Sequence, residues 1–344
     1  MKIICSEEHV FDVAIAQATG KAVMAEACYM ADWDCRAKDG LPEVYAPNRP
    51  HLVSEELAMK HSLEMGESRI VEMDKYGIDM QILSYGVFPQ FLEGQQAIEL
   101  VRAANNRLSE AINLYPTRLA GLAMLPWQVP ADAVNEMERV VNILGLRGVL
   151  LMGRPGNTFL DDVRYEPILA KMHELNVPLY VHPGIPLPAV RDPYYGGFDP
   201  ELSARLSLFA WGWHNEAGIQ VIRMILAGIF EKYPGLQIIS GHWGEMVPFF
   251  LQRLDDSIPQ NISGVSSSIT ETYKRHVYVT PSGMLYVPHF EFIHKILGVD
   301  RIIHSSDYPY FSLDGTKSFI ESLPVSLEDK EKIAYRNVQK LLNL

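Results

Sequence analysis

The chain has 344 residues, of which 48% are hydrophobic, and its formal net charge is -12. This length and apolar content allow a large buried core, and a (β/α)₈ barrel with insertions can reach this size as one domain. The acidic balance, with no basic cluster, argues against binding to a nucleic-acid backbone, although an anionic small substrate stays possible.

The sequence contains no segment typical of membrane insertion or secretion. No run of about 18 apolar residues is present, so we expect no membrane-spanning helix. The N-terminal stretch MKIICSEEHV lacks the apolar region of a signal peptide. Three cysteines, Cys5, Cys28 and Cys35, are too few for a disulfide framework and form no C-x-x-C pair. We therefore expect a cytoplasmic protein.

Eight short β-rich runs alternate with amphipathic segments of helical length along the chain. The predicted strands are mostly continuous apolar runs, which is typical of strands covered on both faces. They span residues 2–5, 80–84, 119–125, 148–152, 178–181, 237–240, 276–280 and 301–304. The predicted helices span residues 68–76, 95–114, 130–144, 165–175, 219–232, 246–256, 288–297 and 327–342.

This alternation predicts a parallel sheet, and a closed (β/α)₈ TIM barrel formed by residues 1–344 as a single domain is its simplest form. An open doubly wound sheet is the alternative, but no G-x-G-x-x-G motif follows the first strand. Long insertions follow the first and fifth strands, at residues 17–66 and 184–216. In a barrel such loops lie over the active face, so we interpret both as lids or subunit contacts.

Imidazole and carboxylate groups follow four of the predicted strands, and the carboxyl ends of barrel strands meet at one rim. Alternate strand residues point to the same side, so Glu7 and His9 can both face the barrel interior. Taken singly, each group has an ordinary explanation, such as a solvated charge or a turn former. Together, two histidines and two carboxylates suit one divalent metal ion, Zn²⁺ or Mn²⁺. The candidate side chains at these strand ends include Glu7, His9, His182 and Asp307.

The sixth strand is followed by an H-x-x-E pair, His242 and Glu245. A carboxylate bonded to one ring nitrogen fixes the tautomer of a histidine, so the pair can act as a catalytic group and its orienter. The alternative is that Glu245 is a first-turn charge favoured by the helix dipole. Arg253 follows in the next helix, where a surface ion pair with Asp255 or Asp256 is equally compatible with the sequence.

Several longer motifs resemble the amidohydrolase superfamily, within it the branch of γ-resorcylate, 2,3-dihydroxybenzoate and 5-carboxyvanillate decarboxylases. They are SEEHV (6–10), GIDMQILS (77–84), LYVHPGIPLP (179–188), IFEKYPGLQIISGHWGEMVPFFLQRLD (229–255) and IIHSSDYPY (302–310). Hydrolytic relatives carry H-x-H on the first strand, whereas this chain has Glu7-x-His9, as the hydroxybenzoate decarboxylases do. The segment 152–162 and the end of the second strand, Ser84-Tyr85-Gly86-Val87, depart from the family pattern, which leaves the particular acid open.

The resemblance implies a metal-dependent, non-oxidative decarboxylase of an ortho-hydroxylated aromatic acid. It implies that Glu7, His9, His182 and Asp307 bind the metal, that His242 and Glu245 form a catalytic pair, and that Arg253 contacts the substrate carboxylate. Asp307 would protonate the ring carbon before CO₂ leaves, because direct loss of CO₂ would form a strongly basic aryl carbanion.

Other functions stay open at this point. A metal-dependent hydrolase of a lactone, ester or amide, with Asp307 as general base, is the alternative enzyme. A catalytically silent metal-binding protein is disfavoured because every side chain of the set is present. The resemblance and the composition of residues 17–66, with Trp33 and Tyr45, also predict a homodimer or homotetramer. We expect no nucleic-acid or membrane partner.

Overall fold

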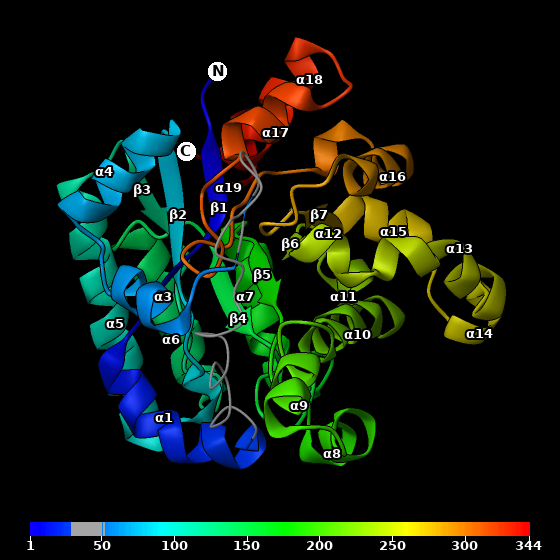
Figure 1. Ribbon diagram of the computed structural model, residues 1–344. Helices are drawn as coiled ribbons and strands as arrows, with labels where there is room; N and C mark the ends of the chain where they lie inside the picture. Colours follow the sequence, from blue (N-terminus) through cyan, green and yellow to red (C-terminus); the bar gives the residue numbers. More distant parts are fainter. Residues whose placement is uncertain (29–49, 51) are drawn as a thin grey trace.

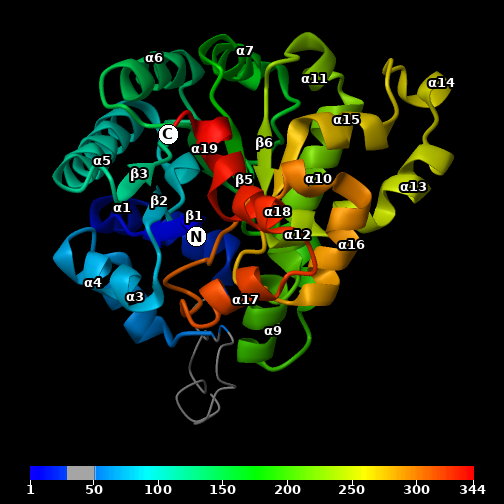
Figure 2. The ribbon, with the colours of Figure 1, turned by 90° about the horizontal axis from the view of Figure 1, so that it is seen from above.

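Parallel strands occupy the centre of the molecule and helices surround them (Figure 1, Figure 2). The computed structural model describes residues 1–28, 50 and 52–344. The strands of this part of the chain are β1 (Ile4–Val10), β2 (Met80–Tyr85), β3 (Leu119–Gly121), β4 (Val149–Met152), β5 (Leu179–His182), β6 (Ile238–Ser240) and β7 (Val277–Val279). Each pairs in parallel with the next inside two sheets, β1-β2-β3 and β4-β5-β6-β7.

Isolated parallel bridges close these two sheets into a ring. The bridge between Ala123 and Val149 joins the two sheets to each other. Bridges from Val279 to Ile302 and from Glu8 to Tyr308 place the segment after residue 301 between β7 and β1. The predicted (β/α)₈ barrel is therefore confirmed, with seven regular strands and an eighth position held by single bridges within the described residues.

The first and last predicted strands differ from the observed elements. Within residues 301–304 only Ile302 forms a bridge and no regular strand is present, because the 3₁₀ turn η4 (Val299–Arg301) occupies the start of this segment. Strand β1 continues past the predicted residues 2–5 to Val10, since its pairing with β2 runs on to Tyr85. A register irregularity between Cys5 and Glu8 adds one residue to β1. As a result both Ile4 and Glu7 face the barrel interior, although they are three residues apart.

The helices form the outer ring, and several more lie within the long segments that connect the strands. They are α1 (Val13–Glu26), α3 (Glu55–Ser62), α4 (Glu67–Tyr76), α5 (Gly94–Leu114), α6 (Pro130–Asn142), α7 (Glu166–Leu175), α8 (Pro188–Tyr195), α9 (Pro200–Ser207), α10 (Gly212–Leu226), α11 (Ile229–Lys232), α12 (His242–Glu245), α13 (Val247–Ser257), α14 (Gln260–Ser263), α15 (Ile269–His276), α16 (Val287–Leu297), α17 (Thr316–Ser322), α18 (Leu327–Glu331) and α19 (Asn337–Leu342). Helices α4, α5, α6, α7, α13 and α16 match predicted segments closely.

Two predicted helices have a different form. The segment 219–232 is divided between α10 and α11, because Gly228 adopts a positive φ of 69°. The segment 327–342 contains a π-helical turn, η5 (Lys332–Arg336), between α18 and α19. The two insertions also contain helices that the sequence did not predict, α1 and α3 in the first and α8 and α9 in the second. Cys35, Trp33 and Tyr45 lie outside the described residues.

Two large hydrophobic clusters make up most of the core of the described residues, and a small third one contains Val23, Ala27, Ile185 and Leu208. One fills the barrel interior with alternate strand residues, among them Ile82, Leu150 and Ile239. The larger one packs the opposite strand faces, including Leu151 and Val181, against the helices. Full burial of each such aliphatic side chain stabilises the fold by about 1.5–3 kcal/mol. Among the helices described, none combines the length and apolar composition that a membrane span requires.

Candidate active site

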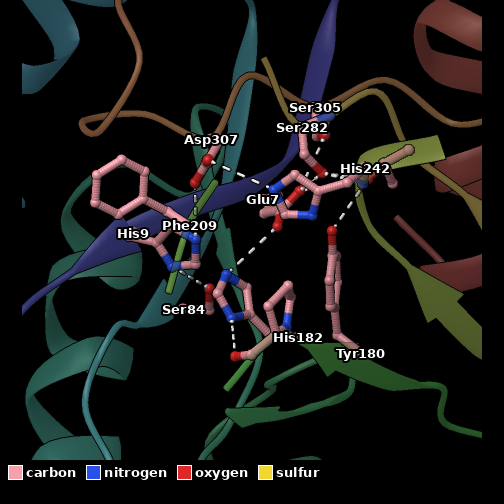
Figure 3. Close-up of polar contacts among 12 residues, drawn as sticks. Glu7, His9, Ser84, Tyr180, His182, Phe209, His242, Ser282, Ser305 and Asp307 are labelled. Carbon is pink, nitrogen blue, oxygen red and sulfur yellow. Dashed lines mark hydrogen bonds and ion pairs between the residues drawn. The ribbon is translucent and has the colours of Figure 1, made fainter. Parts of the chain in front are cut away.

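Glu7, His9, His182 and Asp307 lie together at the carboxyl ends of the strands (Figure 3). All four are buried, and their candidate ligand atoms lie within 4.8 Å of one another. His9 Nε2 is 3.3 Å from Asp307 Oδ1, and His182 Nε2 is 3.6 Å from Glu7 Oε1. The structure thus brings together the four residues that the sequence predicted as metal ligands.

Unpartnered polar atoms in this cluster provide a test of metal binding. Glu7 Oε1 and His9 Nε2 are buried and have no hydrogen-bond partner among the described residues. His182 donates from Nδ1 to the Pro183 carbonyl at 2.8 Å, which leaves the Nε2 lone pair facing Glu7 Oε1. Buried lone pairs that face one another are unfavourable unless a cation lies between them. The donor set therefore fits one divalent ion bound by two imidazoles and two carboxylates.

Three hydroxyl groups hold the other oxygen of Glu7. Ser282 donates a hydrogen bond to Oε2, and the Thr280 and Ser305 hydroxyls each lie 3.3 Å from the same atom. These contacts fix the carboxylate so that Oε1 points toward His182 (Figure 3). The sequence reasoning missed these three residues, because each is one serine or threonine in a chain with many.

The electrostatics of the cluster favour a neutral His182 and a cation. Burial lowers the pKa of His182 to about 3, so its ring is neutral at pH 7. Burial raises the pKa of Glu7, and a divalent ion beside Oε1 would oppose this by stabilising the ionised form. Burial alone would raise the pKa of Asp307, but the nearby imidazoles of His242 and His9 outweigh this effect and lower the pKa. Asp307 is consequently a carboxylate in the resting protein.

His242 and Glu245 form a hydrogen-bonded pair, as the H-x-x-E spacing predicted. His242 Nδ1 donates to Glu245 Oε1 at 2.7 Å, which directs Nε2 toward Asp307 Oδ2 at 3.8 Å. Burial alone would raise the pKa of Glu245, but the charges of His242 and His214 and their hydrogen bonds lower it to about 2. The charge of Glu245 in turn raises the pKa of His242 against the effect of burial. His214 was not identified from the sequence, although it lies inside the insertion 184–216.

The pair lies on a strained turn. From His242 to Met246 five consecutive residues have positive φ values, and four of them are not glycine. The left-handed conformation costs an L-residue roughly 1–2 kcal/mol. Hydrogen bonds from His242 N to Ser282 Oγ at 2.9 Å and from Trp243 N to the Thr280 carbonyl at 2.7 Å hold the turn. The segment labelled α12 is therefore a left-handed turn that points both site residues inward.

The structure does not bring Arg253 to this site. It is exposed on α13 and is not among the residues that line the cavity. Its role as a substrate contact stays a prediction.

A cavity of about 330 Å³ opens onto the predicted ligands His182 and Asp307. The described residues that line it are largely apolar, and they come from both insertions and from the segments at the ends of β-strands. Val23, Met59, Val87, Phe209, Trp213 and Phe311 are examples. Tyr310 also lines the cavity, and burial raises the pKa of its hydroxyl, so the phenol is protonated. This volume and lining suit a small aromatic ring.

Comparison with known proteins places the chain among related enzymes. A family model described as amidohydrolase matches residues 15–344, which include His182 and Asp307. The chain is 31% identical to a γ-resorcylate decarboxylase from a Polaromonas species over 296 residues, which cover 82% of this chain and 88% of that protein.

Solved structures give the same result at the level of the fold. A dihydroxybenzoic acid decarboxylase from Polaromonas with bound manganese and 2-nitroresorcinol superimposes with a TM-score of 0.82 at 27% identity, covering 100% of this chain and 97% of that one. A 5-carboxyvanillate decarboxylase from Novosphingobium aromaticivorans with manganese and 4-hydroxy-3-methoxy-5-nitrobenzoic acid gives 0.85 at 27% identity, covering 100% and 96%.

Proposed function

This chain belongs to the amidohydrolase family, and we propose that it is a metal-dependent, non-oxidative decarboxylase of an ortho-hydroxylated aromatic carboxylic acid. It is thus a carbon–carbon lyase. The observation that carries this proposal is the cluster of Glu7, His9, His182 and Asp307 at the end of a mostly apolar cavity. The cavity suits the ring, and the cluster suits its carboxylate and hydroxyl groups.

One divalent ion would be held by Glu7, His9, His182 and Asp307. It would supply Lewis acidity, which orients an ortho-hydroxybenzoate and offsets its charge. The two related structures contain manganese, and the donor set also suits zinc, so we propose either metal as the native one.

Asp307 is the proposed proton donor to the ring carbon that bears the carboxylate. Because neighbouring groups lower its pKa, Asp307 must first take up a proton. The ortho hydroxyl of the substrate is a proton source at the same place. Protonation of the ring carbon is followed by cleavage of the bond to the carboxylate, whose electron pair restores aromaticity as CO₂ leaves.

His242 is the proposed contact to the substrate hydroxyl or carboxylate. Its Nε2 points toward Asp307, which lines the cavity, and its raised pKa keeps it protonated and therefore a hydrogen-bond donor. Glu245 orients it through Nδ1. The hydrolase alternative is not favoured, because the first strand carries Glu7-x-His9 and the related proteins are decarboxylases.

We also propose a cytoplasmic homo-oligomer. An exposed aromatic patch on α13 and α16 supports self-association: Phe249 is 70% exposed, and its ring lies 5.2 Å from Phe250 and 5.9 Å from Phe292. Arg253 lies on the same helix, one turn after Phe249 and Phe250. In an oligomer built through this patch, Arg253 could contact the substrate of a neighbouring subunit.

The direct test begins with purified protein and measurement of its bound metal. Ultraviolet absorbance then follows the loss of 2,6-dihydroxybenzoate, 2,3-dihydroxybenzoate and 5-carboxyvanillate, and mass spectrometry identifies the product. Metal-dependent release of CO₂ from any of these acids supports the proposal. Absence of turnover with a fully loaded metal site would oppose it, and lactones and esters would then be tested.

A further inference from the structure

We propose that His214 is a positioning residue that holds Glu245 in the orientation in which Glu245 fixes His242. This proposal rests on the decarboxylase function proposed above. His214 Nδ1 lies 2.8 Å from Glu245 Oε2, and His242 Nδ1 lies 2.7 Å from Oε1. A carboxylate accepts hydrogen bonds and does not donate them, so both Nδ1 atoms carry a proton. The Glu245 carboxylate is held between two imidazole rings, whose centroids lie 4.4 Å apart.

Burial makes this second hydrogen bond necessary. The side chain of Glu245 is fully buried, whereas that of His214 retains 15% exposure. With His242 as its single partner, one oxygen of an ionised, buried carboxylate would lack a donor, and such a group is costly. His214 supplies that donor from a different element, the first turn of α10.

The far side of the His214 ring contacts the wall of the substrate cavity. Its Nε2 lies 2.9 Å from the Phe209 carbonyl and 3.3 Å from Trp213 Nε1, and both of these residues line the cavity. Nε2 can donate to the first or accept from the second, but not both. In either arrangement Nδ1 keeps its proton and donates to Glu245. The ring is therefore fixed at both nitrogens.

Helix α10 also contacts Glu245 through its backbone. Gly218 lies one turn after His214 on the same helix face. A Cβ atom at Gly218 would lie 2.8 Å from the Glu245 carbonyl oxygen, so only glycine allows this approach. Both the side chain and the main chain of Glu245 thus pack against α10. This contact supports a turn that is strained by the positive φ values of four non-glycine residues.

The test compares His214→Leu, which removes the donor, with His214→Asn, whose amide nitrogen can replace Nδ1. With whichever acid of the panel the wild type turns over, His214→Leu lowers kcat by about 10–100-fold and changes KM little, a loss typical of residues that orient active-site groups. His214→Asn recovers most of that loss. His289→Leu is the matched control, because the Nδ1 of His289 has no partner among the described residues. Equal losses in the Leu and Asn variants would overturn the proposal.

A double-mutant cycle tests whether His214 acts through Glu245. If it does, His214→Leu causes no further loss of kcat in a Glu245→Gln background, because coupled residues are not additive. Full additivity would contradict the proposal.

A measurement without turnover separates this proposal from the proposed function. In ¹⁵N-histidine-labelled protein, the downfield proton resonance of His242 Nδ1–H should persist in His214→Asn and shift or broaden in His214→Leu. An unchanged resonance in His214→Leu would refute the positioning role, whether or not the protein decarboxylates any acid of the panel.

Discussion

Glu7 Oε1 lies 3.6 Å from His182 Nε2, and the two atoms face each other as lone pairs inside the protein. The other Glu7 oxygen is held by three hydroxyl groups and cannot turn away. A cation bound between these two atoms would therefore stabilise the folded barrel.

Removal of the metal should abolish activity and lower stability. Chelation leaves buried lone pairs unpaired, and a ligand that binds only the folded state stabilises it by about 3 kcal/mol at a hundredfold excess over Kd. We expect the thermal midpoint to fall by several degrees and to recover on addition of Mn²⁺ or Zn²⁺. Calorimetry of the chelated and reloaded protein checks this, and equal midpoints would argue against a metal at this cluster.

Asp307→Asn should lower kcat by about 10²–10⁴-fold, because the amide cannot deliver a proton to the ring carbon. We expect metal to remain bound, since an amide oxygen and three other ligands are still present. Turnover assays and metal analysis of the same sample separate the two effects. Normal activity in this variant would rule out Asp307 as the proton donor.

Ser282→Ala should weaken metal binding by about 10–100-fold, since the Ser282 hydroxyl fixes Glu7 and also accepts from the His242 amide. Ser318→Ala is the control, because the Ser318 hydroxyl bonds only the nearby Gly315 carbonyl among the described residues. Competition with a metal indicator measures both affinities. Equal affinities for the two variants would show that the hydroxyl does not tune Glu7.

His304 should make the protein less stable in acid. It is fully buried, neither ring nitrogen has a partner in the described part of the chain, and burial lowers its pKa to about 3. The unfolded state, with a pKa near 6.5, therefore binds more protons between pH 6.5 and pH 3. The contribution of His304 to the free energy of unfolding is therefore largest above pH 6.5, and it decreases as the pH drops from 6.5 to 3.

The variant His304→Leu should lose this component of the pH dependence. Denaturant unfolding of both proteins at pH 7.5 and pH 4.5 should show a smaller decrease for the variant, by up to a few kcal/mol. Parallel decreases would mean that His304 is not responsible.

Arg253 should act between subunits if it contacts the substrate carboxylate. We expect Arg253→Ala and Asp307→Asn each to be weakly active alone. Mixed after subunit exchange, a random dimer population regains about one quarter of wild-type activity, because hybrid dimers contain one complete site. A normal KM in the Arg253→Ala variant would show that Arg253 does not contact the substrate.

The barrel and the clustering of the four candidate metal ligands could be predicted from the sequence for one physical reason. Buried parallel strands have continuous apolar sequences, which makes them recognisable. Their carboxyl ends lie at one rim of the barrel, so Glu7, His9, His182 and Asp307 were expected to lie close together. The pairing of His242 with Glu245 followed from local spacing.

What the sequence did not predict depends on backbone shape and long-range contact. The left-handed turn at His242–Met246 contains a single glycine, so no composition signal marks it. His214 reaches Glu245 only because Gly218 lets α10 approach. The bulge in β1 and the single bridges that replace an eighth strand result from closing the ring, and no local pattern encodes them.

Residues from the two ends of the chain meet at Glu7. The hydroxyl of Ser305 reaches it across 298 residues of sequence, and Asp307 follows two positions later. Bringing such distant segments together costs about 5 kcal/mol of chain entropy. The candidate ion site can therefore be complete only after the segment around Asp307 has folded back onto the first strand. Metal uptake would then report the final step of assembly, and a nascent or C-terminally truncated chain would stay metal-free however well its middle had folded.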